Sequence, residues 1–119
     1  MEGMRIEKDS LGDVSVPKNA LWGAQTQRSL ENFSAGQNRV PLDLIYALVW
    51  IKRACAQVNG ELGLLDLEIT KSVLFACDKV LEGHYDDQFP LLIWQTGSGT
   101  QTHMNVNEVL ANIASEHMG

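Results

Sequence analysis

Apolar residues recur at helical spacing along a first stretch that follows Pro41. Proline at this position favours a helix start, because its φ is already fixed near the helical value. The apolar row comprises Leu44, Leu48, Ile51, Cys55, Val58 and Leu62. Alternating steps of four and three residues predict a helix face that packs into a bundle, and Ile45 and Val49 widen that face. Gly60 and Gly63 offer places for this helix to end.

The same pattern predicts a second and a third helix. The second has as its apolar row Ile69, Val73, Cys77 and Val80, with Leu74 and Leu81 beside it. Asp66 is placed to cap its start and Gly83 to end it. The third has the row Val106, Val109, Leu110, Ile113 and Ala114. We expect Asn105 or Asn107 to cap it, and we explain Glu108, near that start, by the helix dipole.

The region before Pro41 is poor in helical periodicity and rich in turn residues. Short segments at 5–8 and 13–16 flank the turn residues 9–12, which predicts a small β-hairpin. Residues 25–28 are harder to assign: they fit a short helix with a solvated polar face, but Arg28 is also a weaker candidate for an anion contact. Trp22 is expected to pack against the helical core.

Together these patterns predict one mainly α domain, with an irregular and β lead-in over residues 1–40 and about three packed helices over residues 41–119. The net charge of −6 argues against nucleic acid or an anionic membrane as a partner, but not against a small anion held by local donors. No apolar run approaches the ~18 residues of a membrane span and no signal peptide is recognised, so a soluble protein of a reducing compartment is expected. Cys55 and Cys77 are expected to be buried free thiols.

The most distinctive stretch lies between the second and third predicted helices. An apolar run at 91–93 leads into a glycine and hydroxyl segment at 96–102, which predicts a strand, a turn and a helix in succession. Gly97 and Gly99 leave room for a ligand, so successive N–H groups can converge on an anion at the helix start. An ordinary glycine loop that caps a helix is the alternative. A dinucleotide fingerprint and a phosphate loop are both excluded, because their remaining residues are missing.

Two histidines are weaker candidates. His103 could act as a general base near the ligand, but a base needs an orienting partner, and the sequence shows none. His84 beside Asp86 and Asp87 invites a metal site, which we reject because a site needs three or four converging ligands. Adjacent acids in a turn more often form local hydrogen bonds.

Three blocks of the sequence resemble the N-terminal part of class II fumarases and the wider fumarase and aspartase superfamily. One block is Gln-Thr-Gly-Ser-Gly-Thr-Gln at 95–101 with Met-Asn-Val-Asn-Glu-Val at 104–109. Another is Leu-Trp-Gly-Ala-Gln-Thr-Gln-Arg-Ser at 21–29, preceded by Asp-Ser-Leu-Gly at 9–12. The third is Asp-Asp-Gln-Phe-Pro-Leu at 86–91, at the family's distance from the glycine segment. The resemblance covers nearly the whole chain.

The resemblance implies a cytoplasmic hydro-lyase of the tricarboxylic acid cycle that hydrates fumarate reversibly to (S)-malate without a cofactor or metal. It assigns binding of a substrate carboxylate to Ser98, Gly99 and Thr100. It adds as supporting residues Thr96, Gln101, Asn107 and Arg28. It assigns no catalytic residue to this chain, because the family's catalytic serine and histidine lie in motifs not found here. A truncated piece of a longer homotetramer, inactive alone, is therefore expected.

Two alternatives stay open. The first is a fragment of an aspartase-like ammonia-lyase; such relatives typically have Gly-Gly-Ala-Gly-Thr at 96–100, so Ser98 and Trp94 favour fumarase. The second is a catalytically silent folding or assembly domain with exposed apolar helix faces and a tendency to self-associate. Ile113 departs from the family, which usually has arginine there, and this puts the local packing or a subunit contact in question.

Overall fold

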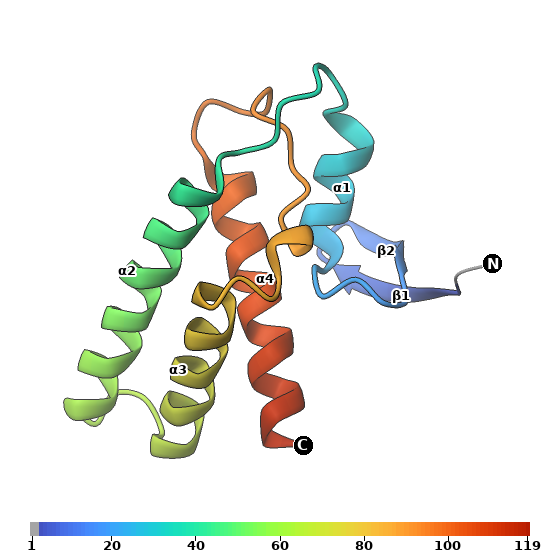
Figure 1. Ribbon diagram of the computed structural model, residues 1–119. Helices are drawn as coiled ribbons and strands as arrows, with labels where there is room; N and C mark the ends of the chain where they lie inside the picture. The colour runs from blue at the N-terminus through green and yellow to red at the C-terminus, as the bar shows by residue number, and fades with distance from the viewer. Residues whose placement is uncertain (1–2) are drawn as a thin grey trace.

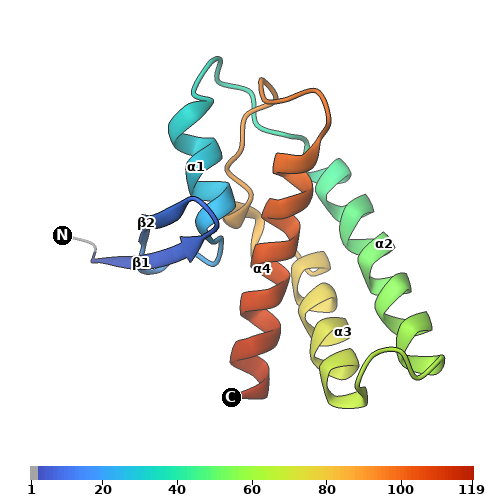
Figure 2. The same cartoon turned by 180° about the vertical axis from the view of Figure 1, so that it is seen from behind.

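The computed structural model describes residues 3–119 and is mainly helical, as the sequence predicts (Figure 1). The elements are β1 Met4–Asp9, β2 Gly12–Pro17, α1 Ala24–Asn32, α2 Leu42–Glu61, α3 Leu67–Leu81, a 3₁₀ turn η1 Asp86–Gln88, and α4 Thr100–Met118. Helix α4 runs through the middle, with α2 and α3 on one side and α1 with the hairpin on the other (Figures 1 and 2). The long helices α2, α3 and α4 are the three predicted from periodicity.

The main core gathers around α4. Val106, Val109 and Leu110 of this helix are buried together with residues of α2 and α3. Ile113, the position at which the family usually has arginine, is 4% exposed and belongs to the same core. Burial of this side chain therefore adds apolar contact where an arginine would need a charged partner. Trp22 packs against the core as expected.

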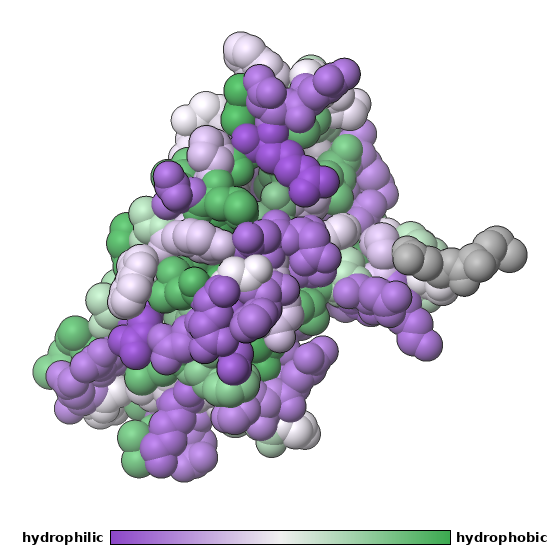
Figure 3. Space-filling model, viewed as in Figure 1, coloured by the Kyte–Doolittle hydropathy of each residue, from purple (hydrophilic) through white to green (hydrophobic). Residues whose placement is uncertain are grey.

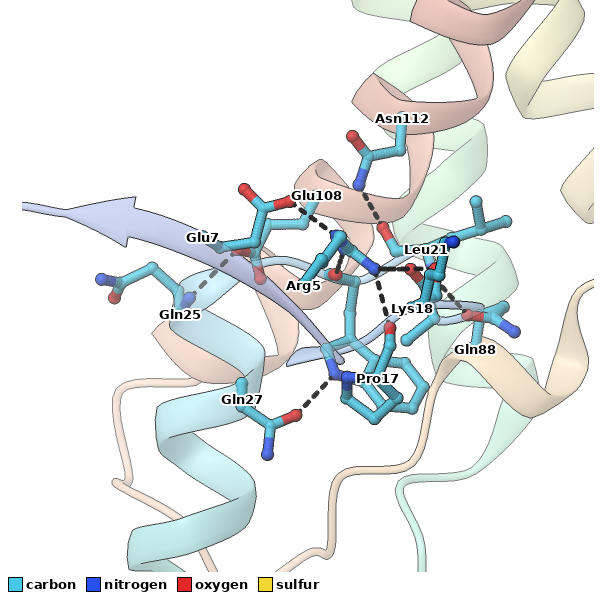
Figure 4. A network of polar contacts seen from close by, with 12 residues as sticks. Arg5, Glu7, Pro17, Lys18, Leu21, Gln25, Gln27, Gln88, Glu108 and Asn112 are labelled. Atoms are coloured by element: carbon cyan, nitrogen blue, oxygen red, sulfur yellow. Dashed lines mark hydrogen bonds and ion pairs between the residues drawn. The ribbon is translucent and has the colours of Figure 1, made fainter. Parts of the chain in front are cut away.

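The hairpin is confirmed, with β1 and β2 antiparallel and Asp9 paired with Gly12 at its turn. Arg5 fastens it to the segment that leads into α1 (Figure 4). Its guanidinium donates to the carbonyl oxygens of Pro17 at 2.8 Å, Ala20 at 2.6 Å and Trp22 at 2.7 Å. Hydrogen bonds from a charged donor are among the stronger ones, so the hairpin is fixed on the domain although two strands alone would be marginal.

Several predicted helix boundaries are confirmed. Asp66 caps α3, since its carboxylate accepts hydrogen bonds from the N–H groups of Glu68 at 3.0 Å and Ile69 at 3.3 Å. Gly63 and Gly83 follow α2 and α3 with φ of 73° and 90°, the left-handed conformation that commonly ends a helix.

The prediction that this apolar row is the packed face of α2 is wrong, because most of the row faces away from the core. Ile51, Val58 and Leu62 are 59%, 50% and 66% exposed, and Cys55 is exposed too, so only Cys77 is the buried thiol that was expected. The buried residues of α2 are Ile45, Val49 and Ala56. Helices α3 and α4 cover only that narrower face, and hydrophobic surface remains along the side of the molecule where α2 lies (Figure 3).

Two expectations about the glycine segment are also wrong. Residues 91–93 form no strand, and Leu92 makes only an isolated bridge with Arg39. Helix α4 begins at Thr100, so Asn105 and Asn107 lie inside it and do not cap it. The reason for the early start is Gly99, whose φ of 77° turns the chain directly into the helix.

No helix within residues 3–119 combines the length and apolarity that crossing a bilayer requires. In the same part of the chain, no three His, Cys, Asp or Glu side chains converge as metal ligands.

Candidate functional site

The loop before α4 leaves open space around its glycines. A Cβ added at Gly97 or Gly99 would meet nothing within 4 Å. Gly99 is the N-cap residue of α4, and it offers no side chain to the free N–H groups of the first turn. Gln95 Oε1 accepts from the N–H of Thr102 in that turn, and the remaining free N–H groups carry the positive end of the helix dipole, which favours an anion.

Three hydroxyl groups line up at the same helix end. The Thr96 Oγ1 and Ser98 Oγ atoms lie 3.3 Å apart, and Ser98 Oγ lies 3.2 Å from Thr100 Oγ1. All three residues are exposed. Because the hydroxyls of Ser98 and Thr100 can rotate to donate, they and the remaining free N–H groups at the start of α4 form one set of donors for a carboxylate.

Two glutamines hold the loop in this shape. Gln101 Oε1 accepts hydrogen bonds from the N–H of Thr96 at 2.8 Å and from its hydroxyl at 2.7 Å, while Gln101 Nε2 donates to Ser29 Oγ at 2.6 Å. Gln95 Oε1 accepts from the N–H of Thr102 at 3.1 Å and from its hydroxyl at 2.9 Å. Gln101 and Thr96 were expected to support the site. Gln95 was not, although an amide on each side of a glycine loop is a signal that could have found it.

The loop forms one wall of a cavity of about 430 Å³. Ser98, Gly99 and Thr100 lie on that wall, and Leu44 and Leu48 of α2 lie on another. A mostly apolar pocket with a few converging polar groups is the usual form of a small-molecule site. The cavity therefore brings together the three residues that the sequence singled out.

His103 also lines this cavity, and it has the partners that the sequence could not reveal. Lys52 Nζ of α2 lies 3.2 Å from its Nδ1, and the side-chain amide of Asn107 lies 3.2 Å from its Nε2. Asn107 is thus held beside His103 and does not line the cavity itself.

Arg28 lies elsewhere. Its guanidinium makes two hydrogen bonds of 2.9 Å to the carboxylate of Asp9 and one of 2.9 Å to the carbonyl of Gly12. The hydrogen bond from Arg28 holds the pKa of Asp9 below its usual value, and the same contact raises the pKa of Arg28. The structure does not bring Arg28 to the loop cavity, so its donors serve the hairpin.

Glu108 has a structural role that differs from the one expected. Its carboxylate accepts hydrogen bonds from the N–H of Gln25 at 3.0 Å and from the N–H of Thr26 at 2.8 Å, and the Thr26 hydroxyl also donates to it (Figure 4). Glu108 therefore caps α1 from the middle of α4. Its carboxylate interacts favourably with the dipole of α1, not with that of α4. A Cβ at Gly23 would collide with this carboxylate, which explains the glycine there.

A second cavity, of about 450 Å³, lies between the hairpin and α4 and is lined by Arg5, Glu7, Lys18 and Asn112 among others. Its strongest donor, Arg5, is already used by backbone carbonyls and by Glu7. Glu7 and Glu116 also line it, so this cavity, unlike the described walls of the loop cavity, carries carboxylates that disfavour an anion.

A family model described as lyase matches residues 12–119, and the chain belongs to that family. Among its curated relatives, fumarate hydratase class II of Yersinia pestis is 59% identical over 119 residues, which are 100% of this chain and 26% of that protein. Fumarate hydratase class II of Pseudomonas putida is 57% identical over 115 residues, 97% of this chain and 25% of that protein.

Solved structures show the same relationship. The chain superposes on class II fumarase of Schistosoma mansoni with a TM-score of 0.95 and 46% identity, covering 98% of this chain and 25% of that one. It superposes on the fumarate lyase:delta crystallin of Brucella melitensis with a TM-score of 0.93 and 39% identity, covering 98% of this chain and 28% of the other. The chain thus spans about a quarter of the length of the relatives it matches.

Proposed function

We propose that this chain is the N-terminal part of a fumarate hydratase and supplies one carboxylate-binding wall of the active site. The observation that carries the proposal is the pair of Ser98 and Thr100 hydroxyls beside the start of α4, where the N-cap residue is a glycine. High identity to proteins named fumarate hydratase class II supports the same reading.

The loop's task follows from the chemistry of hydration. Removing the proton next to a carboxylate of malate places extra negative charge on a group that is already charged. Donors fixed in advance around that charge lower the barrier, and loss of one such donor costs about 100–1,000-fold in rate where this has been measured. Ser98, Gly99 and Thr100 would bind and stabilise the carboxylate, while a general acid and base come from other segments.

We infer that the chain is inactive alone, because among the residues that the structure describes His103 is the one titratable side chain on the cavity and no acid lies there to complete an acid and base pair. The rest of a parent protein would supply them, in a homotetramer whose active sites combine several subunits. As a fumarate hydratase it would act in the tricarboxylic acid cycle, in the cytoplasm. In this proposal the loop at 96–102 belongs to the helical part at 41–119, with residues 1–40 as the lead-in.

Absorbance-monitored conversion of malate to fumarate tests this function. The chain alone should show no turnover, and a mixture with a separately expressed fragment carrying the remaining three-quarters of a relative should restore it. Ser98→Ala should lower the restored rate strongly, whereas Ser10→Ala in the hairpin turn should not. Turnover by the chain alone, or full activity with Ser98→Ala, would contradict the proposal.

An ammonia-lyase acting on aspartate is the second candidate within the same family, and the loop argues against it. Such enzymes typically carry Gly-Gly-Ala-Gly-Thr at this place, and the Ser98 hydroxyl of this chain is part of the donor row. Ammonia release from aspartate in the same mixture distinguishes the two. A silent assembly domain is favoured only by the exposed apolar side of α2.

A further inference from the structure

Lys52 is a cation without a carboxylate partner. Within residues 3–119, no Asp or Glu oxygen lies within the 4.0 Å of an ion pair around its Nζ. Its nearest polar contact is His103 Nδ1 at 3.2 Å. Burial lowers the pKa of Lys52 below its ordinary value. A partly desolvated and unpaired ammonium gains electrostatic energy when an anion binds beside it.

The contact with Lys52 fixes the state of the His103 ring. An ammonium can only donate a hydrogen bond, so Nδ1 must accept, and the single proton of the neutral ring lies on Nε2. Asn107, 3.2 Å from Nε2, then turns its amide oxygen toward the ring. His103 is thereby oriented from two sides at the wall of the loop cavity.

The spacing of the two groups matches a dicarboxylate. Thr100 and His103 are three residues apart on α4 and both line the cavity, so they lie on one face of the helix about one turn, or ~5 Å, apart along its axis. A four-carbon dicarboxylate has its two charged ends separated by a comparable length. One carboxylate on the hydroxyl row would therefore bring the other near His103 and Lys52.

We propose that Lys52, held by His103 at the edge of this cavity, is a second anion contact and makes the cavity select dicarboxylates over monocarboxylates. The inference rests on the proposed function, since it needs the loop to hold the first carboxylate. Lys52 is the residue that contacts the ligand, because its ammonium keeps two N–H donors free of the described part of the chain, whereas both ring nitrogens of His103 are engaged and His103 is the positioning residue. The acidic character of the whole chain makes this local cation the feature that distinguishes the cavity.

The test compares fumarate with crotonate, which is the same trans-alkene with a methyl group in place of one carboxylate. Both are titrated into the ¹⁵N-labelled 119-residue chain, and amide shifts of residues 96–103 report binding. Fumarate should bind about fivefold tighter than crotonate, the effect of one added charge contact at a solvated site. Lys52→Met and His103→Asn should both abolish this difference by weakening the binding of fumarate.

The matched control is Lys71→Met, a lysine of α3 whose Nζ lies 3.7 Å from Glu68 and does not line the cavity. It should keep the fumarate preference. The ring ¹⁵N shifts of His103 give a second readout. They should show the Nε2–H tautomer in the ligand-free chain, and Lys52→Met should lose this preference. A dispersed amide spectrum of each variant shows that it is folded. Because the two variants change different positions, the test remains valid if one of them does not fold.

The outcomes separate the two proposals. Equal binding of fumarate and crotonate to the loop amides overturns the second anion contact and leaves the loop as a carboxylate site. A fumarate preference that survives Lys52→Met and His103→Asn overturns it as well. Absence of loop shifts with either ligand overturns the second anion contact in this chain, whereas absence of turnover in the mixture overturns the proposed function.

Discussion

Helices α2 and α4 have nearly the same length, 20 and 19 residues, and both carry apolar residues at helical spacing. Helix α4 buries its whole row, because α1, α2 and α3 all pack around it. Helix α2 buries only a narrow face, and the row with the more regular spacing is exposed. Periodicity thus identifies a face that is suited to burial, but not whether the chain itself provides the partner.

The apolar row of α2 therefore belongs to the surface of this chain and not to its core. Contiguous apolar surface of this kind marks places where other chains or segments bind. Its regular alternation of three and four residues is the spacing that another helix can match side by side. The difference between the two helices can be tested by matched substitutions, beginning with the core.

The largest expected effect contrasts two isoleucines. Ile113→Ala in α4 removes a side chain that is 4% exposed in the main core and should lower the free energy of unfolding by about 2–5 kcal/mol. Ile51→Ala in α2 removes one that is 59% exposed and should change it by less than about 0.5 kcal/mol. Urea denaturation followed by circular dichroism measures both. Equal losses would mean that the α2 row is covered in solution, for example by self-association.

A second contrast concerns the way α4 supports α1. Glu108→Gln keeps the size of the side chain but leaves an amide NH₂ facing the N–H groups of α1, and should lower the unfolding free energy by about 1–3 kcal/mol. Glu116→Gln, on the exposed last turns of α4, is the control and should have little effect. The same denaturation measurement applies. If both variants lose equal stability, the cap on α1 contributes nothing specific.

The two cysteines provide a chemical probe of the exposed and buried faces. Cys55 of α2 is exposed, whereas Cys77 of α3 is fully buried, and burial raises the pKa of Cys77 to about 11 from 9.0. Only the thiolate reacts, so at pH 8 a thiol reagent should label Cys55 quickly and Cys77 only when the protein unfolds. Cys55→Ser should remove the fast phase. A fast phase that persists in this variant would contradict the burial of Cys77.

The smallest effect is expected at the hairpin, away from both helices. The hydrogen bond from Arg28 lowers the pKa of Asp9 in the folded chain, so the pair stabilises the fold above the ordinary Asp value of 3.8, and this is lost as the pH falls through the lowered pKa. Asp9→Asn should lower the melting temperature slightly at pH 7, and the difference should shrink toward pH 3. Asp13→Asn, on the same hairpin, is the control. A difference that stays constant with pH would rule out the charge as its cause.

Much of the architecture follows from local sequence signals. Asp66, Gly63 and Gly83 act through their nearest neighbours, so the boundaries they set can be predicted. The hairpin is equally local. The start of α4 was placed too late, because Gly99 begins the helix through its own backbone conformation and the asparagines that resemble caps lie inside it.

The site could be predicted only as far as it is contiguous in sequence. Ser98, Gly99 and Thr100 lie on one cavity wall, as their spacing indicates. The contact of His103 with Lys52 spans 51 positions, and that of Gln101 with Ser29 spans 72. Such pairs depend on how helices pack, which no local pattern encodes. Arg28 was assigned to the site for the same reason: the sequence does not show that its partners are Asp9 and Gly12.

The cap that Glu108 places on α1 also affects the order in which parts of the chain can fold during synthesis. The two contacting segments are 82 and 83 residues apart, whereas α2 and α3 are neighbours in sequence and can pair as soon as both exist. On a ribosome that adds about 5–20 residues per second, Glu108 is synthesised several seconds after α1. Residues 24–32 are among the first helical residues to emerge, and until Glu108 follows they lack this cap and stay open to chaperones and proteases.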